Sequence, residues 1–133
     1  MSAREKEREN MSLYSVLLVD DEEEVFQVIM KKLDWEGMGF RIAGYARNGV
    51  EALEMAEELS VDVVMTDIKM PYMDGLEATR LIRGYSKDIP IIALTAFAFE
   101  SDRERAIEAG CNDYLTKPVS QEAIEKILDK YSL

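Results

Sequence analysis

The sequence predicts an α/β fold: one doubly wound domain with a five-stranded parallel sheet and five helices. Short apolar runs alternate strictly with segments whose apolar residues recur at helical spacing, and consecutive parallel strands require crossover helices of this kind. The first run, Val16–Val19, is continuous rather than alternating, as expected of a strand that is buried on both faces. At 133 residues, of which 47% are hydrophobic, the chain is the size of one ordinary domain with a full core.

Each expected strand is a short run bounded by polar or turn-forming residues. Val16–Val19 is uniformly aliphatic, and Pro90 opens the run that begins at Ile91. The strands are expected at residues 16–19, 40–45, 61–66, 91–94 and 113–116.

Each expected helix begins or ends at a residue suited to that position. Three begin with a polar residue followed three residues later by Glu, the spacing of a capping box: Asp21 with Glu24, Asn48 with Glu51, and Ser101 with Glu104. A turn at Met73–Gly75 precedes the third helix, and Gly110 is a natural stop for the fourth. The helices are expected at residues 21–33, 48–59, 75–83, 101–110 and 120–131.

Composition narrows the functional class. The chain has one cysteine, Cys111, and no histidine, which excludes an intrachain disulfide, a histidine metal site and a histidine base. A net charge of −11 disfavours direct binding to nucleic acid, because phosphate contacts require clustered Lys and Arg. No apolar stretch approaches the roughly 20 residues of a membrane span. We therefore expect a soluble cytoplasmic protein with neither a nucleic-acid nor a membrane partner.

Residues 1–12 form a charge run with almost no apolar content and without the apolar core of a signal peptide. We interpret them as a tail that is either disordered or an addition to the native chain. Residues 13–133 are expected to form the folded domain.

Residues suited to phosphoryl chemistry follow four of the expected strands. Asp20 and Asp21 come after the first strand, Asp67 after the third, Thr95 after the fourth and Lys117 after the fifth. Because the carboxyl ends of parallel strands share one sheet edge, these side chains are expected to converge on one pocket, with the first strand near the centre. Each residue alone has an ordinary explanation as a cap, strand or loop residue. Their joint placement favours a site.

The residue types indicate magnesium-dependent phosphoryl transfer. Asp67 is placed to attack a phosphorus atom and form an aspartyl phosphate. Because a phosphoryl group repels a carboxylate, a hard cation is needed, and Asp20, Asp21 and Asp67 with a backbone carbonyl near Lys69 supply the oxygen ligands that Mg²⁺ prefers. The lysine and the threonine at the same edge supply a positive charge and a hydroxyl donor to the phosphate.

The chain resembles the receiver domain of two-component response regulators over residues 14–131, nearly its whole length. The resemblance rests on four motifs: Val19–Glu22, Thr66–Gly75, Leu94–Ala96 and Tyr114–Pro118. It implies the strand order 2-1-3-4-5 of flavodoxin-like folds. Leu33–Phe40 is closer to receivers attached to helix-turn-helix transcription factors, and Ala93–Pro118 to those of hybrid histidine kinases, which leaves the parent architecture open.

The resemblance also implies a role for each candidate residue. By position, these are Asp67 as phosphoacceptor; Asp20, Asp21, Asp67 and the backbone carbonyl of Lys69 as Mg²⁺ ligands; Thr95 and Lys117 as phosphate sensors; Tyr114 as switch aromatic; and Pro118 as a cis-peptide candidate.

The implied partners are a histidine kinase or histidine phosphotransfer domain, which donates the phosphoryl group, and a downstream effector. Since this chain has no histidine, the donor must be another chain or domain. The implied output surface, which also offers a homodimer contact, consists of the helix at 101–110, the strand at 113–116 and the last helix from residue 120. Intrinsic chemistry is expected to be limited to autophosphorylation and autodephosphorylation with Mg²⁺, without turnover of a metabolite.

Two alternative functions are weighed against this one. A phosphate-independent interaction module of the same fold is disfavoured by the intact Asp67, Thr95 and Lys117. A phosphohydrolase of the haloacid dehalogenase type needs a second Asp two residues after the nucleophile, and that position holds Glu22 after Asp20 and Lys69 after Asp67.

Overall fold

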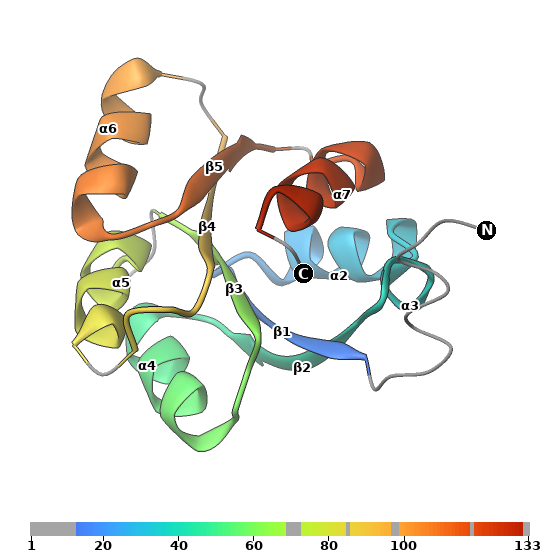
Figure 1. The fold of residues 1–133 in the computed structure, drawn as a ribbon, viewed down its shortest axis with the longest axis horizontal. Coiled ribbons are helices and arrows are strands. Elements are labelled where there is room, and N and C mark those ends of the chain that lie inside the picture. Colours follow the sequence, from blue (N-terminus) through green and yellow to red (C-terminus); the bar gives the residue numbers. More distant parts are fainter. Residues whose placement is uncertain (1–12, 69–72, 85, 97–98, 118, 132–133) are drawn as a thin grey trace.

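A parallel five-stranded sheet forms the centre of the computed structural model, which describes residues 13–68, 73–84, 86–96, 99–117 and 119–131 (Figure 1). Its strands are β1 (Tyr14–Val19), β2 (Phe40–Ala46), β3 (Val63–Asp67), β4 (Ile91–Thr95) and β5 (Asp113–Thr116). They lie in the order β2-β1-β3-β4-β5, and every pairing is parallel. The predicted doubly wound fold and its strand order are confirmed.

The described residues form six helices, one more than the five expected. They are α2 (Glu23–Lys32), α3 (Trp35–Met38), α4 (Gly49–Glu58), α5 (Gly75–Arg83), α6 (Glu100–Ala109) and α7 (Gln121–Lys130). In Figure 1, α2, α3 and α7 lie on one side of the sheet, and α4, α5 and α6 lie on the other. None of these helices has the length and apolar character needed to cross a bilayer.

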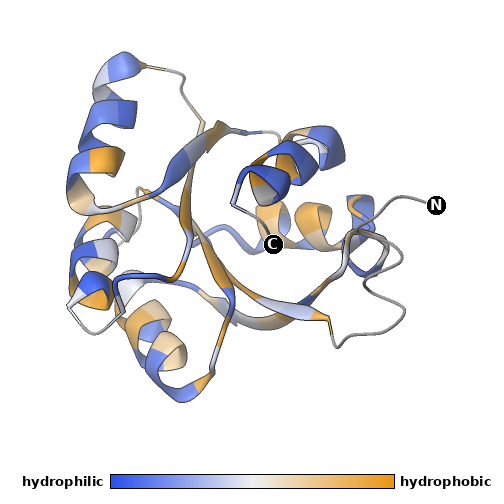
Figure 2. Ribbon diagram, viewed as in Figure 1, coloured by the Kyte–Doolittle hydropathy of each residue, from blue (hydrophilic) through white to orange (hydrophobic). Residues whose placement is uncertain are grey.

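The sheet separates two apolar cores, and β1 contributes to both. Val16 and Leu18 face the core beneath α2, α3 and α7, whereas Leu17 and Val19 face the core beneath α4, α5 and α6. Figure 2 shows the strands as largely apolar and the helices as mixed. Burial on both faces is the reason that the three inner strands, β1, β3 and β4, are largely apolar runs in the sequence, whereas the outer strands β2 and β5 are partly exposed and more polar.

The additional helix, α3, lies between α2 and β2. The carboxylate of Asp34 accepts a hydrogen bond from Gly37 N at 2.9 Å, and Gly39 ends the helix in the left-handed region at φ 98°. Trp35 is buried, and its indole Nε1 donates to Ile29 O at 3.2 Å. The helix was not predicted because four residues are too few to display helical periodicity.

Helix α7 is fastened at both ends. At its start, Gln121 Oε1 accepts a hydrogen bond from the backbone N–H of Asp34, which links the helix to the segment before α3. At its end, the Tyr131 hydroxyl donates to Asn112 O, and Lys130 Nζ lies 3.0 Å from Asp113 Oδ2. These contacts join α7 to α3 at one end and to the start of β5 at the other.

The predicted helix caps are partly confirmed. Asn48 begins α4 as expected, with its Oδ1 accepting a hydrogen bond from the N–H three residues later at 2.9 Å, and Gly110 ends α6 at φ 112°. The prediction is wrong for Asp21 and Ser101, because Glu22 precedes α2 and Phe99 precedes α6 at the N-cap position. Capping-box spacing alone does not determine the residue at which the backbone enters the helix.

Asn48 and Ser101 both have capping-box spacing in the sequence, but their replacement is expected to affect the stability of the protein differently. Asn48→Ala removes an observed cap bond and should lower the free energy of unfolding by about 1 kcal/mol. Ser101→Ala removes an exposed side chain within the first turn of α6 and should change it by less than about 0.5 kcal/mol. Urea unfolding followed by circular dichroism measures both, and equal effects would contradict the assignment.

Candidate functional site

The carboxyl ends of β1, β3, β4 and β5 lie together at one sheet edge, around a cavity of about 410 Å³. Asp20 follows β1, Asp67 closes β3, Thr95 closes β4 and Lys117 follows β5. The cavity is lined by Asp21, Glu22, Val25, Asp67, Thr95, Ala96 and Lys117. The structure thus brings together, at this edge, residues that are as many as 97 positions apart in the sequence.

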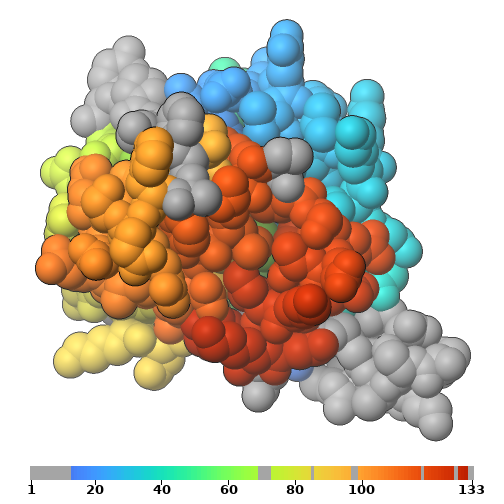
Figure 3. Space-filling model, turned by 90° about the horizontal axis from the view of Figure 1, so that it is seen from above, coloured from blue at the N-terminus to red at the C-terminus, as the bar shows by residue number. Residues whose placement is uncertain are grey.

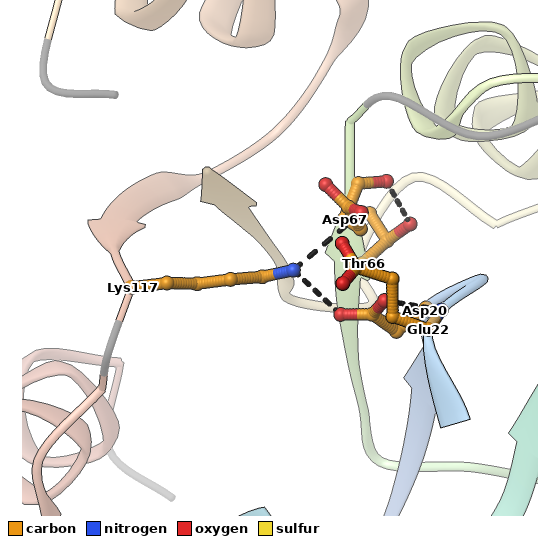
Figure 4. A network of polar contacts seen from close by, with 5 residues as sticks. All are labelled: Asp20, Glu22, Thr66, Asp67 and Lys117. Carbon is orange, nitrogen blue, oxygen red and sulfur yellow. Dashed lines mark hydrogen bonds and ion pairs between the residues drawn. The ribbon is translucent and has the colours of Figure 1, made fainter. Parts of the chain in front are cut away.

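Lys117 joins two of the acids. Its Nζ lies 2.6 Å from Asp20 Oδ2 and 3.5 Å from Asp67 Oδ2 (Figure 4). The three side chains are only 14%, 4% and 10% exposed, so the ion pairs are largely shielded from water. Burial alone would lower the pKa of Lys117, but its hydrogen bond to Asp20 and the charge of Asp67 outweigh burial and raise the pKa above its usual value.

Asp20 is held in place by three contacts. Its Oδ1 accepts a hydrogen bond from Glu22 N at 2.9 Å, its Oδ2 accepts one from Lys117, and its backbone N–H donates to Ala46 O at 3.0 Å. The first contact turns the chain after β1 so that the following acids stay at the same edge. A buried carboxylate fixed in this way presents its oxygens in a defined orientation.

Three consecutive acids form a cluster that suits a hard cation. Carboxylate oxygens of Asp20, Asp21 and Glu22 lie within 4.8 Å of one another, and the last two residues are exposed to solvent. Such an all-oxygen donor set fits Mg²⁺, Mn²⁺ or Ca²⁺ better than softer metals. Glu22 was not selected from the sequence as a candidate ligand, although its place beside the acidic pair was a usable signal.

The position of Asp67 is set by the start of α5, where the chain packs closely against the end of β3. The Thr66 hydroxyl donates to Asp67 O at 2.9 Å, and Gly75 N donates to Ile68 O at 3.3 Å. A Cβ built on Gly75 would lie 2.1 Å from Asp67 O and 2.8 Å from Thr66 Oγ1. Glycine is therefore required where α5 begins, because any side chain there would displace the backbone of Asp67.

Thr95 and Tyr114 lie on the two strands beside the cavity. Thr95 is 2% exposed, and its carbonyl accepts a hydrogen bond from Lys117 N at 2.6 Å, so the two predicted phosphate sensors are connected through the backbone. Tyr114 is half-buried on β5 and packs against the core beneath α4, α5 and α6. Lys69 and Pro118, the predicted carbonyl ligand and cis-peptide candidate, lie outside the described residues.

An apolar groove of about 530 Å³ adjoins the cavity between α2 and the start of α7. It is lined by Glu24, Val25, Val28, Ile29, Lys32, Lys117, Val119 and Ser120. Val25 and Lys117 line both hollows, so the groove and the acidic cavity are neighbours. Val28 remains 48% exposed.

The chain is similar to known signalling proteins in sequence and in structure. It is 41% identical over 109 residues to the chemotaxis protein CheY of Halobacterium salinarum. This alignment covers 82% of this chain and 88% of that protein. It is 38% identical to the response regulator MprA of Mycobacterium tuberculosis over 82% of this chain and 46% of MprA, so it spans about half the length of that relative.

A solved structure shows the same similarity. The receiver domain of the sensor histidine kinase PA1611 of Pseudomonas aeruginosa, with a magnesium ion coordinated in its active site cleft, is 36% identical with a TM-score of 0.78. The alignment covers 90% of this chain and 97% of that chain. The family model of the response regulator receiver domain matches residues 16–129. With its 2-1-3-4-5 parallel sheet, the chain therefore belongs to the receiver domain family of two-component response regulators.

Proposed function

We propose that this receiver domain accepts a phosphoryl group on Asp67 and uses it as a reversible signal. The observation that carries the proposal is the Lys117 ammonium, which lies 2.6 Å from Asp20 Oδ2 and 3.5 Å from Asp67 Oδ2. A shielded cation beside an aspartate in an open cavity is placed to attract the negative charge of a phosphoryl group on that aspartate.

The proposed transfer is a displacement at phosphorus. An Asp67 carboxylate oxygen forms a P–O bond as the P–N bond of a phosphorylated histidine breaks, and the leaving imidazole nitrogen takes up a proton. Asp20, Asp21 and Asp67, with the backbone carbonyl of Lys69, would hold Mg²⁺, whose charge offsets the repulsion between carboxylate and phosphoryl oxygens. The magnesium in the similar P. aeruginosa receiver supports this choice of ion. Hydrolysis of the acyl phosphate regenerates Asp67.

The phosphoryl donor in this proposal is a histidine kinase or a histidine phosphotransfer domain. A histidine that reaches Asp67 must enter the acidic cavity, and the adjoining apolar groove is then within reach of the protein that carries it. The exposed Val28 offers apolar contact there. The groove therefore gives the donor protein a surface next to the reacting atoms.

The proposed response spreads from Thr95 and Lys117 to a surface formed by α6, β5 and α7. Phosphate on Asp67 attracts the Thr95 hydroxyl and the Lys117 ammonium, and Tyr114 changes its packing as the β4 end moves. Figure 3 shows α6 and α7 on one face of the molecule. On α6 and at its start, Ile107 is 47% and Phe99 61% exposed, which favours contact with an effector or a second copy.

The test is to incubate the protein with Mg²⁺ and acetyl phosphate and measure its intact mass at short times. The wild type should gain one phosphoryl group, and Asp67→Asn should gain none, because an amide lacks the nucleophilic carboxylate oxygen. Asp88→Asn, at an exposed position in the turn before β4, is the matched control and should be modified like the wild type.

Two results would contradict the proposal. A stable adduct on Asp67→Asn would mean that another residue is the acceptor. An unmodified wild type, under conditions that trap a short-lived acyl phosphate, would favour the phosphate-independent interaction module.

A further inference from the structure

The hydroxyl of Tyr45 is buried without a hydrogen-bond partner. Within the described ranges it is the only buried side-chain nitrogen or oxygen in this condition. A buried polar atom left unpaired costs about 1–3 kcal/mol. Native structures keep few such atoms, and each calls for a ligand, a water or a functional reason.

Tyr45 lies beside the acidic pair. It is the second-last residue of β2 and pairs with Leu18 of β1, and the next residue, Ala46, accepts a hydrogen bond from Asp20 N at 3.0 Å. Tyr45 therefore lies near the carboxyl end of β2, the strand beside the one that the acids follow. Its strand partner, Leu18, precedes Asp20 by two residues. Nothing in the sequence pattern singles out Tyr45 itself.

The ring of Tyr45 is fixed by Phe26 of α2. The two rings stack at a centroid distance of 3.8 Å and an interplanar angle of 11°. Since α2 begins directly after the loop that carries Asp20, Asp21 and Glu22, this stacking ties Tyr45 to the helix that follows the acids. The position of the hydroxyl is thus set by ring packing.

The acids act on the hydroxyl electrostatically. Burial raises the pKa of Tyr45, the charges of Asp20, Glu23 and Asp21 raise it further, and Arg47 partly opposes them. The hydroxyl therefore lies in the electrostatic field of the acidic loop and stays protonated at neutral pH. A neutral phenol keeps a lone pair to accept a hydrogen bond and a proton to donate one.

We propose that Tyr45 is a positioning residue for the cation site, its phenolic oxygen accepting a hydrogen bond from a water held by Mg²⁺ at Asp20 and Asp21. The inference rests on the proposed function and extends it to a residue outside the ligand set. Mg²⁺ keeps several of its waters in protein sites, and a neighbouring oxygen can accept a hydrogen bond from one of them. Outer-shell partners of this kind commonly change metal affinity 10–100-fold.

The test variant is Tyr45→Phe, which removes the hydroxyl and keeps the stacking on Phe26. Titration calorimetry should give a Mg²⁺ Kd about tenfold higher than that of the wild type. The melting temperature in EDTA should be unchanged or higher, because the variant no longer buries an unpaired hydroxyl. Loss of metal affinity without loss of metal-free stability is the result that a purely structural tyrosine would not give.

Tyr14→Phe is the matched control. Tyr14 is also half-buried and contacts a phenylalanine, Phe40, at a ring distance of 5.6 Å, but it begins β1 at the opposite edge of the sheet. Its variant should bind Mg²⁺ as tightly as the wild type does.

The outcomes separate this inference from the proposed function. If Tyr45→Phe binds Mg²⁺ with the wild-type Kd, or loses affinity and metal-free stability together, the positioning role is overturned while the phosphoacceptor proposal stands. If the wild type binds no Mg²⁺ in the titration, the magnesium part of the proposed function fails, and the role of Tyr45 fails with it.

Discussion

Replacing Lys117 with methionine is expected to lower the free energy of unfolding of the metal-free protein by about 3–5 kcal/mol. The Asp20 and Asp67 side chains are only 4% and 10% exposed, and Lys117 is the cation that contacts both. Without it, two shielded carboxylates at the same end of the sheet lose the ion pairs that Lys117 makes with them. The penalty comes chiefly from the charges left behind rather than from the lost contacts.

The same substitution is expected to strengthen Mg²⁺ binding. In the structure, the ammonium already occupies Asp20 Oδ2 at 2.6 Å, so a metal ion at the acidic pair competes with it for that oxygen. We expect the Mg²⁺ Kd of Lys117→Met to fall by about tenfold, equivalent to about 1.4 kcal/mol. Saturating Mg²⁺ should then restore most of the lost stability, because it replaces the missing positive charge.

Urea unfolding in EDTA and in Mg²⁺, together with titration calorimetry, measures both effects. Lys130→Met is the control, since Lys130 Nζ also pairs with an aspartate, Asp113 at 3.0 Å, but its side chain is 65% exposed. Exposed pairs contribute little, so this variant should resemble the wild type. A Lys117→Met protein that is as stable as Lys130→Met in EDTA, or that binds Mg²⁺ more weakly, would refute the competition.

Gly75→Ala is expected to disturb both stability and chemistry at Asp67. The added methyl group would lie 2.1 Å from Asp67 O, a backbone atom that cannot turn aside as a flexible side chain can. Relieving the clash requires β3 and the start of α5 to separate, at a cost of about 3 kcal/mol, the upper end for overpacking. A shift of the nucleophile by about 1 Å costs about 100-fold in rate.

Thermal unfolding and the rate of modification by acetyl phosphate test this prediction. Gly84→Ala is the matched control, because its nearest non-neighbouring atom is Leu81 O at 3.1 Å and its φ of −64° suits any residue. We expect a markedly smaller loss of stability and a wild-type rate. A Gly75→Ala protein that is modified at the wild-type rate would show that Asp67 tolerates the displacement.

The sheet could be predicted because burial on both faces makes each of the inner strands β1, β3 and β4 a short apolar run in the sequence. The same topological rule carried Asp20, Asp67, Thr95 and Lys117 to one edge, since parallel strands end together whatever their sequence separation. The sequence could not show which of these side chains contact one another. The Lys117–Asp20 contact depends on the length and direction of two side chains from different strands.

The errors have local physical causes. Asp21 and Ser101 have the spacing of helix caps, but each helix begins where the incoming loop sets the backbone angles. Helix α3 is stabilised by the burial of Trp35 and by one cap bond, neither of which produces a periodic pattern. Tyr45 has no signature at all, because its unpaired hydroxyl is defined only by its surroundings in three dimensions.

The hydrogen bonds at both ends of α7 affect how a partner distinguishes the phosphorylated from the unphosphorylated state of this domain. The backbone N–H of Asp34 bonds to the first turn, and the carbonyl of Asn112 bonds to Tyr131 just after the last, so a tilt of the α7 axis would break a hydrogen bond at one end or the other. In the proposed switch, a protein that binds across α6, β5 and α7 therefore meets an α7 whose position changes less than the positions of the other two elements. Its contacts with α7 then supply affinity that the two states largely share, and its contacts with α6 and β5 supply most of the preference for one state.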